Sequence, residues 1–353
     1  AGTINLVWQA MGVFAKIFGL SPQHAFHVFR IIIIPLLVFV FYFSVSFFIK
    51  NRAERITALF LALFGSGLGA WLYPFLKIES WSISGKFSAP LDLSVPEFSP
   101  FWSSLYSPHF ILSWICLAAS VVLLIKTFED SSLKKAVLAG TIGFFYFHFH
   151  PYYAPFLATF ALGLFIYSWA QKRELKRPLL ALIVYLVLCA PPILYHAALI
   201  FYDYSLTARA VQNQTWSPPL LMSLIGVGMF LPFAVIGAFE KSPWDFRRKA
   251  LIFWAILHPI FMYLPLSVQR RFSEGWILPL AILSAAGFSR FYGFAGRFIV
   301  LTPASKKIFF AAVFFIFFGY SNYSILLLKI RQALQGSPRP YIEESFMQAV
   351  RLG

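Results

Sequence analysis

The stretch FHFHPYY, residues 147–153, sets two imidazoles and two phenols between long apolar runs. Their convergence favours a working site over a turn that only happens to contain histidine. His148 and His150 are two residues apart, so both can bind one metal only if the local backbone is extended. No cysteine or nearby carboxylate completes a metal site, which leaves His148, His150 and Tyr152 as candidate substrate-binding residues. The alternative is that the histidines cap an interfacial turn.

Paired arginines occur in VQRRFSEGWILP, where Arg270 and Arg271 precede Glu274 at the start of an apolar run. Cations near hydrocarbon need an anionic partner, and the forked donors of guanidinium suit phosphate. One carboxylate cannot neutralise two guanidiniums, so these residues predict a phosphate site for a bound substrate. Two alternatives stay open: contact with lipid headgroups, and a local pair with Glu274.

His109 and Arg30 are further candidates at the ends of apolar runs. A structural role is expected for His109 unless it faces the other two histidines. Arg30 shares one helical face with His24 and His27, at a spacing of three residues. This face is expected to anchor an interfacial helix, with Arg30 within reach of a lipid phosphate.

Three loops complete the set of candidates. FYDYSLTARAVQNQTW carries Asp203 and Arg209, for which an ordinary solvated loop is the alternative. The long segment 77–107 is proline-rich and nearly free of charge, and such loops are often lids. We therefore expect it to cover an outer cavity. Gly65 and Gly69 of FGSGLGAW favour a helix contact over a phosphate cradle, because no strand precedes them.

The composition indicates what must position these residues. The chain has 353 residues, of which 59% are hydrophobic and 12% are charged, and a bilayer rather than water accommodates that much apolar surface. The net charge of +16 does not indicate nucleic acid as a partner, because the basic residues form short clusters between apolar runs. Cys116 and Cys189 lie within apolar runs, so neither a disulfide framework nor a thiolate metal site is expected.

Ten apolar runs are candidate spanning helices, which predicts an all-α fold, a polytopic transmembrane bundle. The runs cover residues 29–49, 56–76, 108–125, 136–150, 153–170, 178–200, 218–239, 250–266, 276–291 and 308–328. We expect an outer amphipathic segment at 1–28, a transmembrane domain at 29–328, and the start of an outer soluble tail at 329–353.

Charge asymmetry predicts the orientation. One set of alternate connections carries 18 of the 29 lysines and arginines, and the other set, with both termini, carries 11. The positive-inside rule assigns the richer set to the cytoplasm. We therefore expect a multi-pass protein of the plasma (inner) membrane with both ends of this chain on the outer face. The loops 77–107, 201–217 and 267–275 and the FHFHPYY turn then also lie outside.

Two runs are too short to cross a bilayer fully. From Lys135 to His150 is 15 residues, roughly 22 Å of helix, against a hydrocarbon core of roughly 30 Å. The span from Glu274 to Ser289 has the same length. Both outer ends are therefore expected to lie below the outer surface, where turns are tolerated only inside protein or beside a wet cavity. The alternative is that Lys135 snorkels or the bilayer thins.

Several phrases occur in an order that is typical of one superfamily. An amphipathic segment ends in FGLSPQHAFHVFRI, a proline-rich outer loop ends in SPHF, and an HPYY turn follows. QRRFSEGWILPLAILSAAG and a tail beginning RPYIEESFMQAVR come after them. In this order the chain resembles the GT-C superfamily of membrane glycosyltransferases, and in layout the protein O-mannosyltransferases and lipid-A aminoarabinose transferases. The resemblance extends over nearly the whole chain and rests on topology and short phrases.

The resemblance implies transfer of a sugar on the outer face from a polyprenyl-phosphate donor. In that superfamily an acidic residue of the first outer loop acts as the base or as a metal ligand. This sequence departs from the pattern, because residues 1–30 contain no Asp or Glu. We therefore expect the first helix and the acidic residue to lie before Ala1, unless the catalytic residue is lost. The segment from Pro338 resembles the opening of an outer soluble domain, with Ile342, Phe346 and Ala349 on one helical stripe.

Two other functions remain open at this stage. The chain could be a transporter or flippase of a lipid-linked or anionic substrate, with Arg270 and Arg271 in its path, or a membrane subunit without chemistry of its own. Paired broken helices in symmetric halves would favour the transporter, but no internal repeat is evident. No cofactor is identifiable, and a divalent metal is an open alternative.

Overall fold

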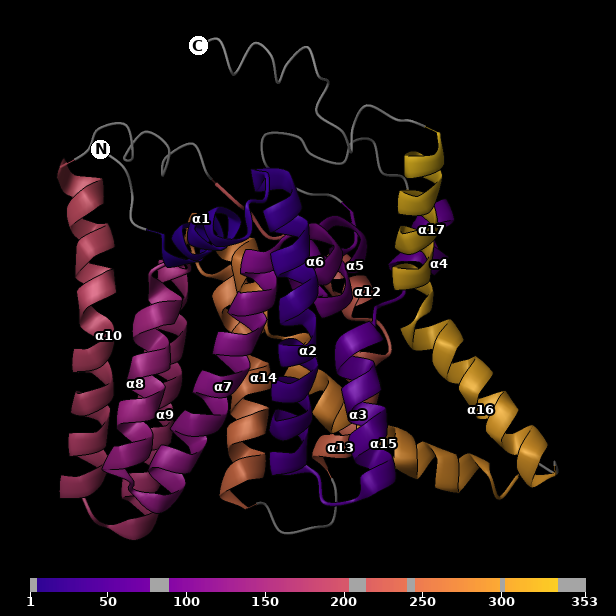
Figure 1. The fold of residues 1–353 in the computed structure, drawn as a ribbon. Coiled ribbons are helices and arrows are strands. Elements are labelled where there is room, and N and C mark those ends of the chain that lie inside the picture. Colours follow the sequence, from indigo (N-terminus) through magenta and orange to yellow (C-terminus); the bar gives the residue numbers. More distant parts are fainter. Residues whose placement is uncertain (1–4, 77–88, 203–213, 240–244, 299–301, 336–353) are drawn as a thin grey trace.

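The computed structural model describes residues 5–76, 89–202, 214–239, 245–298 and 302–335. Within these ranges every regular element is a helix, in agreement with the predicted all-helical membrane bundle (Figure 1). Five of the described helical segments are long and apolar enough to cross a membrane, or up to eight if each bent pair is one span. The count of ten spans stays a prediction.

One half of the bundle consists of long helices packed side by side. α8 packs between α7 and α10, and α2 packs against α7. These elements are α2 (Pro22–Phe48), α7 (Pro108–Asp130), α8 (Leu133–Phe147), α9 (Ala154–Lys172) and α10 (Lys176–Tyr202). α8 has 15 residues, so the short fourth helix predicted from the sequence is confirmed.

The other half is built around close helix contacts. α13 (Phe230–Ala238) and α15 (Ile277–Ala295) approach so closely that a side chain at Gly237 or Gly287 would meet the backbone of the partner helix. Such small residues let apolar helices pack without a hydrophobic driving force from water. α3 (Arg52–Phe64) and α14 (Phe246–Tyr263) also pack against α15.

Three of the predicted spans are bent sharply. α3 turns by 54° into α4 (Gly69–Leu72) and η1 (Tyr73–Phe75). α12 (Leu220–Val227) meets α13 at 74°, and α16 (Pro303–Phe318) meets α17 (Tyr320–Leu334) at 67°. Figure 1 shows α16 leaning away from the rest of the bundle.

The glycine-rich stretch FGSGLGAW forms the first of these bends. The sequence predicts one helix over residues 56–76, but α3 ends at Phe64 and α4 begins at Gly69. The predicted helix contact is present at Gly65, where an added side chain would meet Phe230 of α13. The bend between α12 and α13 likewise contains Gly228, whose φ of +56° is a conformation that favours glycine. Glycine here changes the direction of the chain.

The connections on one side of the bundle are short helices. This side, which we call the α1 face, carries α1 (Leu6–Phe18), α5 (Leu91–Ser94), η2 (Pro96–Phe98) and α6 (Pro100–Tyr106), and it is uppermost in Figure 1. Of the expected lid 77–107, residues 89–107 are largely helical and buried, and residues 77–88 lie outside the described residues. The tail 336–353 lies outside the described residues.

The start of the first long helix also differs from the prediction. Ser21 caps α2 and Pro22 occupies its first turn, so the helix begins at residue 22 and not near residue 29. His24, His27 and Arg30 therefore belong to a long helix that continues into the bundle, not to a separate interfacial helix.

Candidate functional site

A buried polar cluster forms where three elements meet at the α1 face. Glu274 follows η4 (Gln269–Ser273) and is fully buried, and His150 precedes η3 (Pro151–Tyr153) with 2% of its surface exposed. The His150 Nδ1 atom lies 3.4 Å from Oε2 of Glu274 and 2.8 Å from Oγ of Ser113 on α7. The Tyr152 hydroxyl is 2.9 Å from the same nitrogen. One imidazole thus connects a carboxyl, a hydroxyl and a phenol.

Two more tyrosines hold this cluster in place. The Tyr146 hydroxyl, on α8, lies 3.0 Å from Oγ of Ser113. The Tyr153 hydroxyl donates to the backbone carbonyls of Arg271 and Glu274. The histidine turn and the arginine turn are therefore fastened to each other, although more than 100 residues separate them.

The arginine turn adds the charges. The guanidinium of Arg271 lies 5.1 Å from the centre of the Tyr152 ring, which is cation–π geometry. The backbone N–H of Arg270 donates to the carbonyl of Thr215 at 2.9 Å. Both arginines thus sit on a short helix whose backbone is held from two sides, so their positions are fixed before any ligand arrives.

Glu97 is a site residue that the sequence interpretation missed. It lies on η2, which packs against η4, and only 4% of its surface is exposed. Its carboxylate interacts electrostatically with Arg270, Arg271 and Glu274. Two buried carboxyl groups thus accompany the two arginines, whereas only Glu274 is close to them in sequence. The available signal was an acidic residue in a loop nearly free of charge.

The remaining predicted residues divide into those near the cluster and those away from it. His109 faces it, with its ring centre 5.6 Å from that of His150. His148 lies on the other side of the turn, where its ring packs against Phe144 and Tyr195. Arg30 donates to the carbonyl of Leu105 at 2.6 Å and so ties α2 to α6. Asp203 and Arg209 lie outside the described residues.

Within the part of the chain that the structure describes, neither a metal site nor His258 extends the cluster. Among the described residues, no group of three or more His, Cys, Asp or Glu side chains is arranged to hold a metal ion. His258 is fully buried, and its Nδ1 atom lies 2.6 Å from the carbonyl oxygen of Phe272. The motif LHPIF predicts that His258 is a buried helix histidine, and its position within α14 confirms this.

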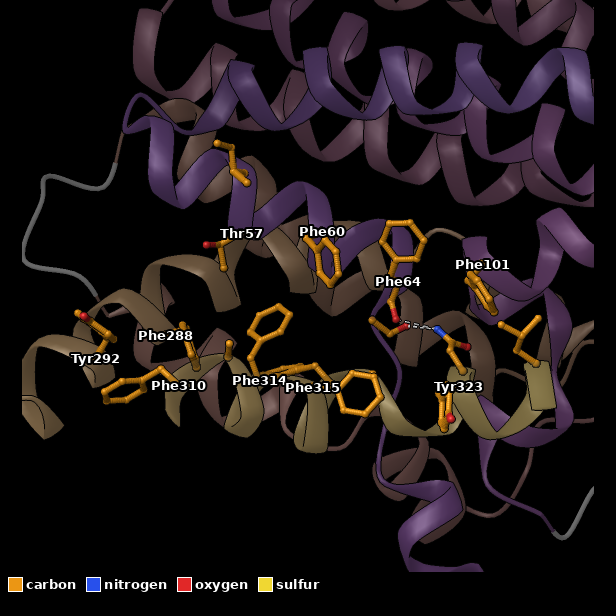
Figure 2. Close-up of a pocket in the computed structure, with 17 residues that line it drawn as sticks. Thr57, Phe60, Phe64, Phe101, Phe288, Tyr292, Phe310, Phe314, Phe315 and Tyr323 are labelled. Carbon is orange, nitrogen blue, oxygen red and sulfur yellow. Dashed lines mark hydrogen bonds between the residues drawn. The ribbon is translucent and has the colours of Figure 1, made fainter. Parts of the chain in front are cut away.

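An apolar groove of about 700 Å³ opens beside this site, between α3, α15, α16 and α17 (Figure 2). Its walls are aromatic, and rings from different helices face each other across it. Phe60 and Phe314 have ring centres 5.8 Å apart, and Phe64 and Phe101 have ring centres 6.0 Å apart. Hydropathy predicted these helices but not the groove, because it arises from the outward lean of α16.

A hydrogen bond links the wall of the groove to the segment that carries Glu97. Asn322, in its wall, donates to the carbonyls of Phe64 and Gly65, both at 2.9 Å (Figure 2). The Asn322 side-chain oxygen accepts from the hydroxyl of Ser99 at 3.3 Å. Since Ser99 is two residues from Glu97, the polar end of the groove adjoins the segment that carries a site carboxylate.

Comparison with known proteins yields no relative. No family model, no curated protein and no solved structure matches this chain. Any functional conclusion therefore rests on the buried charges, the tyrosine and histidine cluster, and the apolar groove.

Proposed function

We propose that this chain belongs to a GT-C-like membrane glycosyltransferase that transfers a sugar from a polyprenyl-phosphate-linked donor on the outer face of the membrane. One observation carries the proposal. The aromatic groove of about 700 Å³ is hydrogen-bonded at Asn322 to Ser99, which directly follows η2, and η2 packs against η4 with its paired, partly buried arginines. A ligand that fits both parts has a long apolar chain and an anionic head.

The groove supports the apolar half of such a donor. Its lining is almost wholly hydrophobic, and it opens between α3 and α16 toward the side of the bundle. Ligand pockets of several hundred Å³ bury most of a medium-sized ligand. A prenyl chain could enter laterally without crossing the polar cluster.

Arg270 and Arg271 support the anionic half. A guanidinium matches two phosphate oxygens with parallel N–H donors, and such charge-assisted bonds are about twice as strong as neutral ones. The hydrogen bond from the Tyr153 hydroxyl to the carbonyl of Arg271 fixes the backbone of η4 in advance, which lowers the conformational entropy lost on binding. Glu97 interacts electrostatically with both arginines.

The chemistry follows from the donor. An acceptor hydroxyl attacks the anomeric carbon, the bond from that carbon to the phosphate oxygen breaks, and the polyprenyl phosphate leaves with the electron pair. The hydroxyl proton passes to a carboxylate. Glu97 supplies one, because its Oε2 atom is buried and has no hydrogen-bond partner in the described part of the chain.

Binding of a polyprenyl-phosphate sugar to the purified protein tests the proposal. One charge-assisted bond is worth about 1.5–3 kcal/mol, so Arg270→Ala and Arg271→Ala should each weaken binding about ten- to a hundredfold. Arg271→Lys should restore only part of the affinity, because lysine lacks the fork. The matched control is Arg290→Ala, which removes a half-buried arginine from the far end of α15.

Equal affinity in wild type and both alanine variants would reduce these arginines to headgroup anchors and remove the main support for a phosphate-linked donor. A loss of the same size in Arg290→Ala would show that only the total charge matters.

The three bent helix pairs favour a second candidate, a transporter or flippase of a lipid-linked or anionic substrate. Discontinuous helices often form the substrate and ion sites of transporters. The bends are 54°, 74° and 67°, and all three lie in the half of the bundle that contains the groove. Vesicles with a labelled lipid-linked sugar distinguish the two: a transferase forms a glycosylated product, whereas a flippase moves the intact lipid across the bilayer.

A further inference from the structure

The three helix bends meet around one carboxyl group, that of Asp92. Asp92 lies on α5, which packs against α4, α12, α17 and η2, and none of its surface is exposed. Its Oδ2 atom accepts from the backbone N–H of Gly69 at 3.1 Å. A side chain at Gly69 would collide with Asp92, so the carboxyl group is packed directly against the first bend. The position requires both the acid and the glycine.

Backbone groups exposed by one bend bond to another bend. The N–H of Ser66 donates to the carbonyl of Phe318 at 2.6 Å, which joins the α3–α4 bend to the end of α16. The N–H of Leu68 donates to the carbonyl of Ile225 at 2.9 Å, which joins the same bend to α12. Ser321, at the start of α17, accepts from the N–H of Ala70 at 3.0 Å. The three bends therefore form one connected unit, which we call the bend junction.

Among the described residues, no cationic side chain offsets the charge of the Asp92 carboxyl group. α4 and α12 carry no titratable side chain, and Lys329 and Arg331 of α17 are exposed. Among the described elements packed against α5, Glu97 on η2 is the only acidic residue, and it is not a cause of the shift in the Asp92 pKa. Burial raises the pKa of Asp92, and Ser321 and nearby backbone groups lower it by less.

The same residues that form the bend junction also form the wall of the groove. Gly65, Phe318 and Gly319 belong to the bends and line the apolar space, and Asn322 bridges α3 and α17 across its end. A change of bend angle in α16–α17 relative to α3 would therefore change the width of the groove. Helix breaks are places where small local changes become large movements of the attached segments.

We propose that Asp92 is a proton-binding site that sets the bend angles of the bend junction and thereby the width of the groove. With the proton bound, the carboxyl group is neutral and the bend junction is closed. Without it, a buried charge that has no cationic partner favours entry of water and loosens the bends. This inference does not depend on the donor or on sugar transfer, because it concerns the bundle itself.

The direction of the pH effect follows from burial. Burial raises the pKa of Asp92 from 3.8 to about 7, and the hydrogen bonds from Ser321, Gly69 and Gly67 lower it by less. Because this folded-state pKa exceeds the unfolded value, the stability that protonated Asp92 contributes is fully present below about pH 4 and is lost as the pH rises toward 7. The bend junction should loosen as folded Asp92 loses its proton, around pH 7, and stay loose above it.

Pulsed electron–electron spin resonance on two labels tests the inference. In a protein with Cys116 and Cys189 replaced by alanine, labels at Arg52 and Ile308 report the separation of α3 and α16, since both positions are exposed. In nanodiscs at about pH 5.5 and about pH 8.5, values on either side of the Asp92 pKa, the distance distribution should shift outward and broaden at the higher pH.

Three variants make the result specific to Asp92. Asp92→Asn should keep the narrow low-pH distribution at both values. Ser321→Ala, which removes a hydrogen bond that stabilises the charged form, should move the midpoint to higher pH and serves if Asp92→Asn does not fold. Asp130→Asn, at an exposed residue paired with Lys135, should behave as wild type. A wild-type distribution that is equal at both pH values, or an unchanged response in both Asp92→Asn and Ser321→Ala, would overturn the proposal.

Discussion

The Tyr153 hydroxyl joins the two turns of the candidate site through the carbonyls of Arg271 and Glu274. Tyr153→Phe leaves both carbonyls without this donor in a buried position, at a cost of about 1–3 kcal/mol in the free energy of unfolding. Thermal or denaturant unfolding in detergent measures it. Tyr292→Phe is the matched control, because that side chain is 40% exposed and should change stability by less than about 0.5 kcal/mol.

Tyr153→Phe should weaken donor binding as well, since the backbone that carries the arginines loses these hydrogen bonds. A Tyr153→Phe variant as stable as Tyr292→Phe would mean that water replaces the lost donor and that the turn is held by other contacts.

Glu97 allows a prediction about chemistry rather than stability. If Glu97 accepts the proton of the acceptor hydroxyl, Glu97→Gln should lower kcat about 10²- to 10⁴-fold and leave the affinity for the donor within a few fold. Steady-state transfer and direct donor binding, measured on the same preparation, separate the two effects. Glu174→Gln, at an exposed residue of the α9–α10 connection, should match wild type in both measurements.

Loss of donor affinity with unchanged kcat would instead make Glu97 a positioning partner of the arginines. The base would then have to be sought elsewhere.

Part of this residue-level site was predictable. The short run before His150 and the short run after Glu274 indicated that the two turns lie at similar depth, and the structure brings His150, Glu274 and Arg271 together. The structure does not bring the His148 ring beside that of His150, and the reason is local. His148 has φ −67° and ψ −25°, so the turn is helical and the two rings point apart. Glu97 was not found because 173 residues separate it from Arg270.

At the scale of helices, hydropathy located the apolar runs but not their directions. Periodicity is the same in a straight helix and in two short ones, so the bends after Phe64, Val227 and Phe318 left no trace in the apolar pattern. Glycine was the available sign, since Gly65, Gly228 and Gly319 stand at the three breaks. A lone glycine is also common in straight membrane helices, and the sequence could not decide between the two.

The first bend gives a prediction of its own. Gly69→Ala should lower the free energy of unfolding by about 1–3 kcal/mol, because the added carbon would overlap Asp92 in a packed region. Gly12→Ala is the matched control, as nothing lies within 4 Å of the added carbon there. It should be neutral or stabilise α1 by up to about 1 kcal/mol through helix propensity.

Denaturant unfolding of both variants in the same detergent makes the comparison. If Gly69→Ala matched Gly12→Ala, α5 would have to move freely against α4, and the bend junction would not be a connected unit.

The whole molecule has two unlike ends. The α1 face carries the site, the short helices and the end of α17, whereas the connections α2–α3, α7–α8 and α9–α10 lie on the opposite face (Figure 1). The basic clusters KNRAER and QKRELKRP fall at that opposite face. There Arg247 pairs with Glu129 at 2.8 Å and packs on Phe47, which links α14, α7 and α2.

This polarity predicts the orientation in the membrane. The positive-inside rule assigns the face opposite the α1 face to the cytoplasm. In a protein without its native cysteines, Lys134→Cys should react with an impermeant thiol reagent only after the membrane is opened, and Gln9→Cys should react in sealed cells. Both side chains are exposed in the structure, so failure to react would report sidedness rather than burial. The reverse pattern would place the arginines and the groove at the cytoplasmic side. A donor presented on the outer face could then not reach them, and the transferase proposal would fail together with the topology, while the proton site at Asp92 would be unaffected.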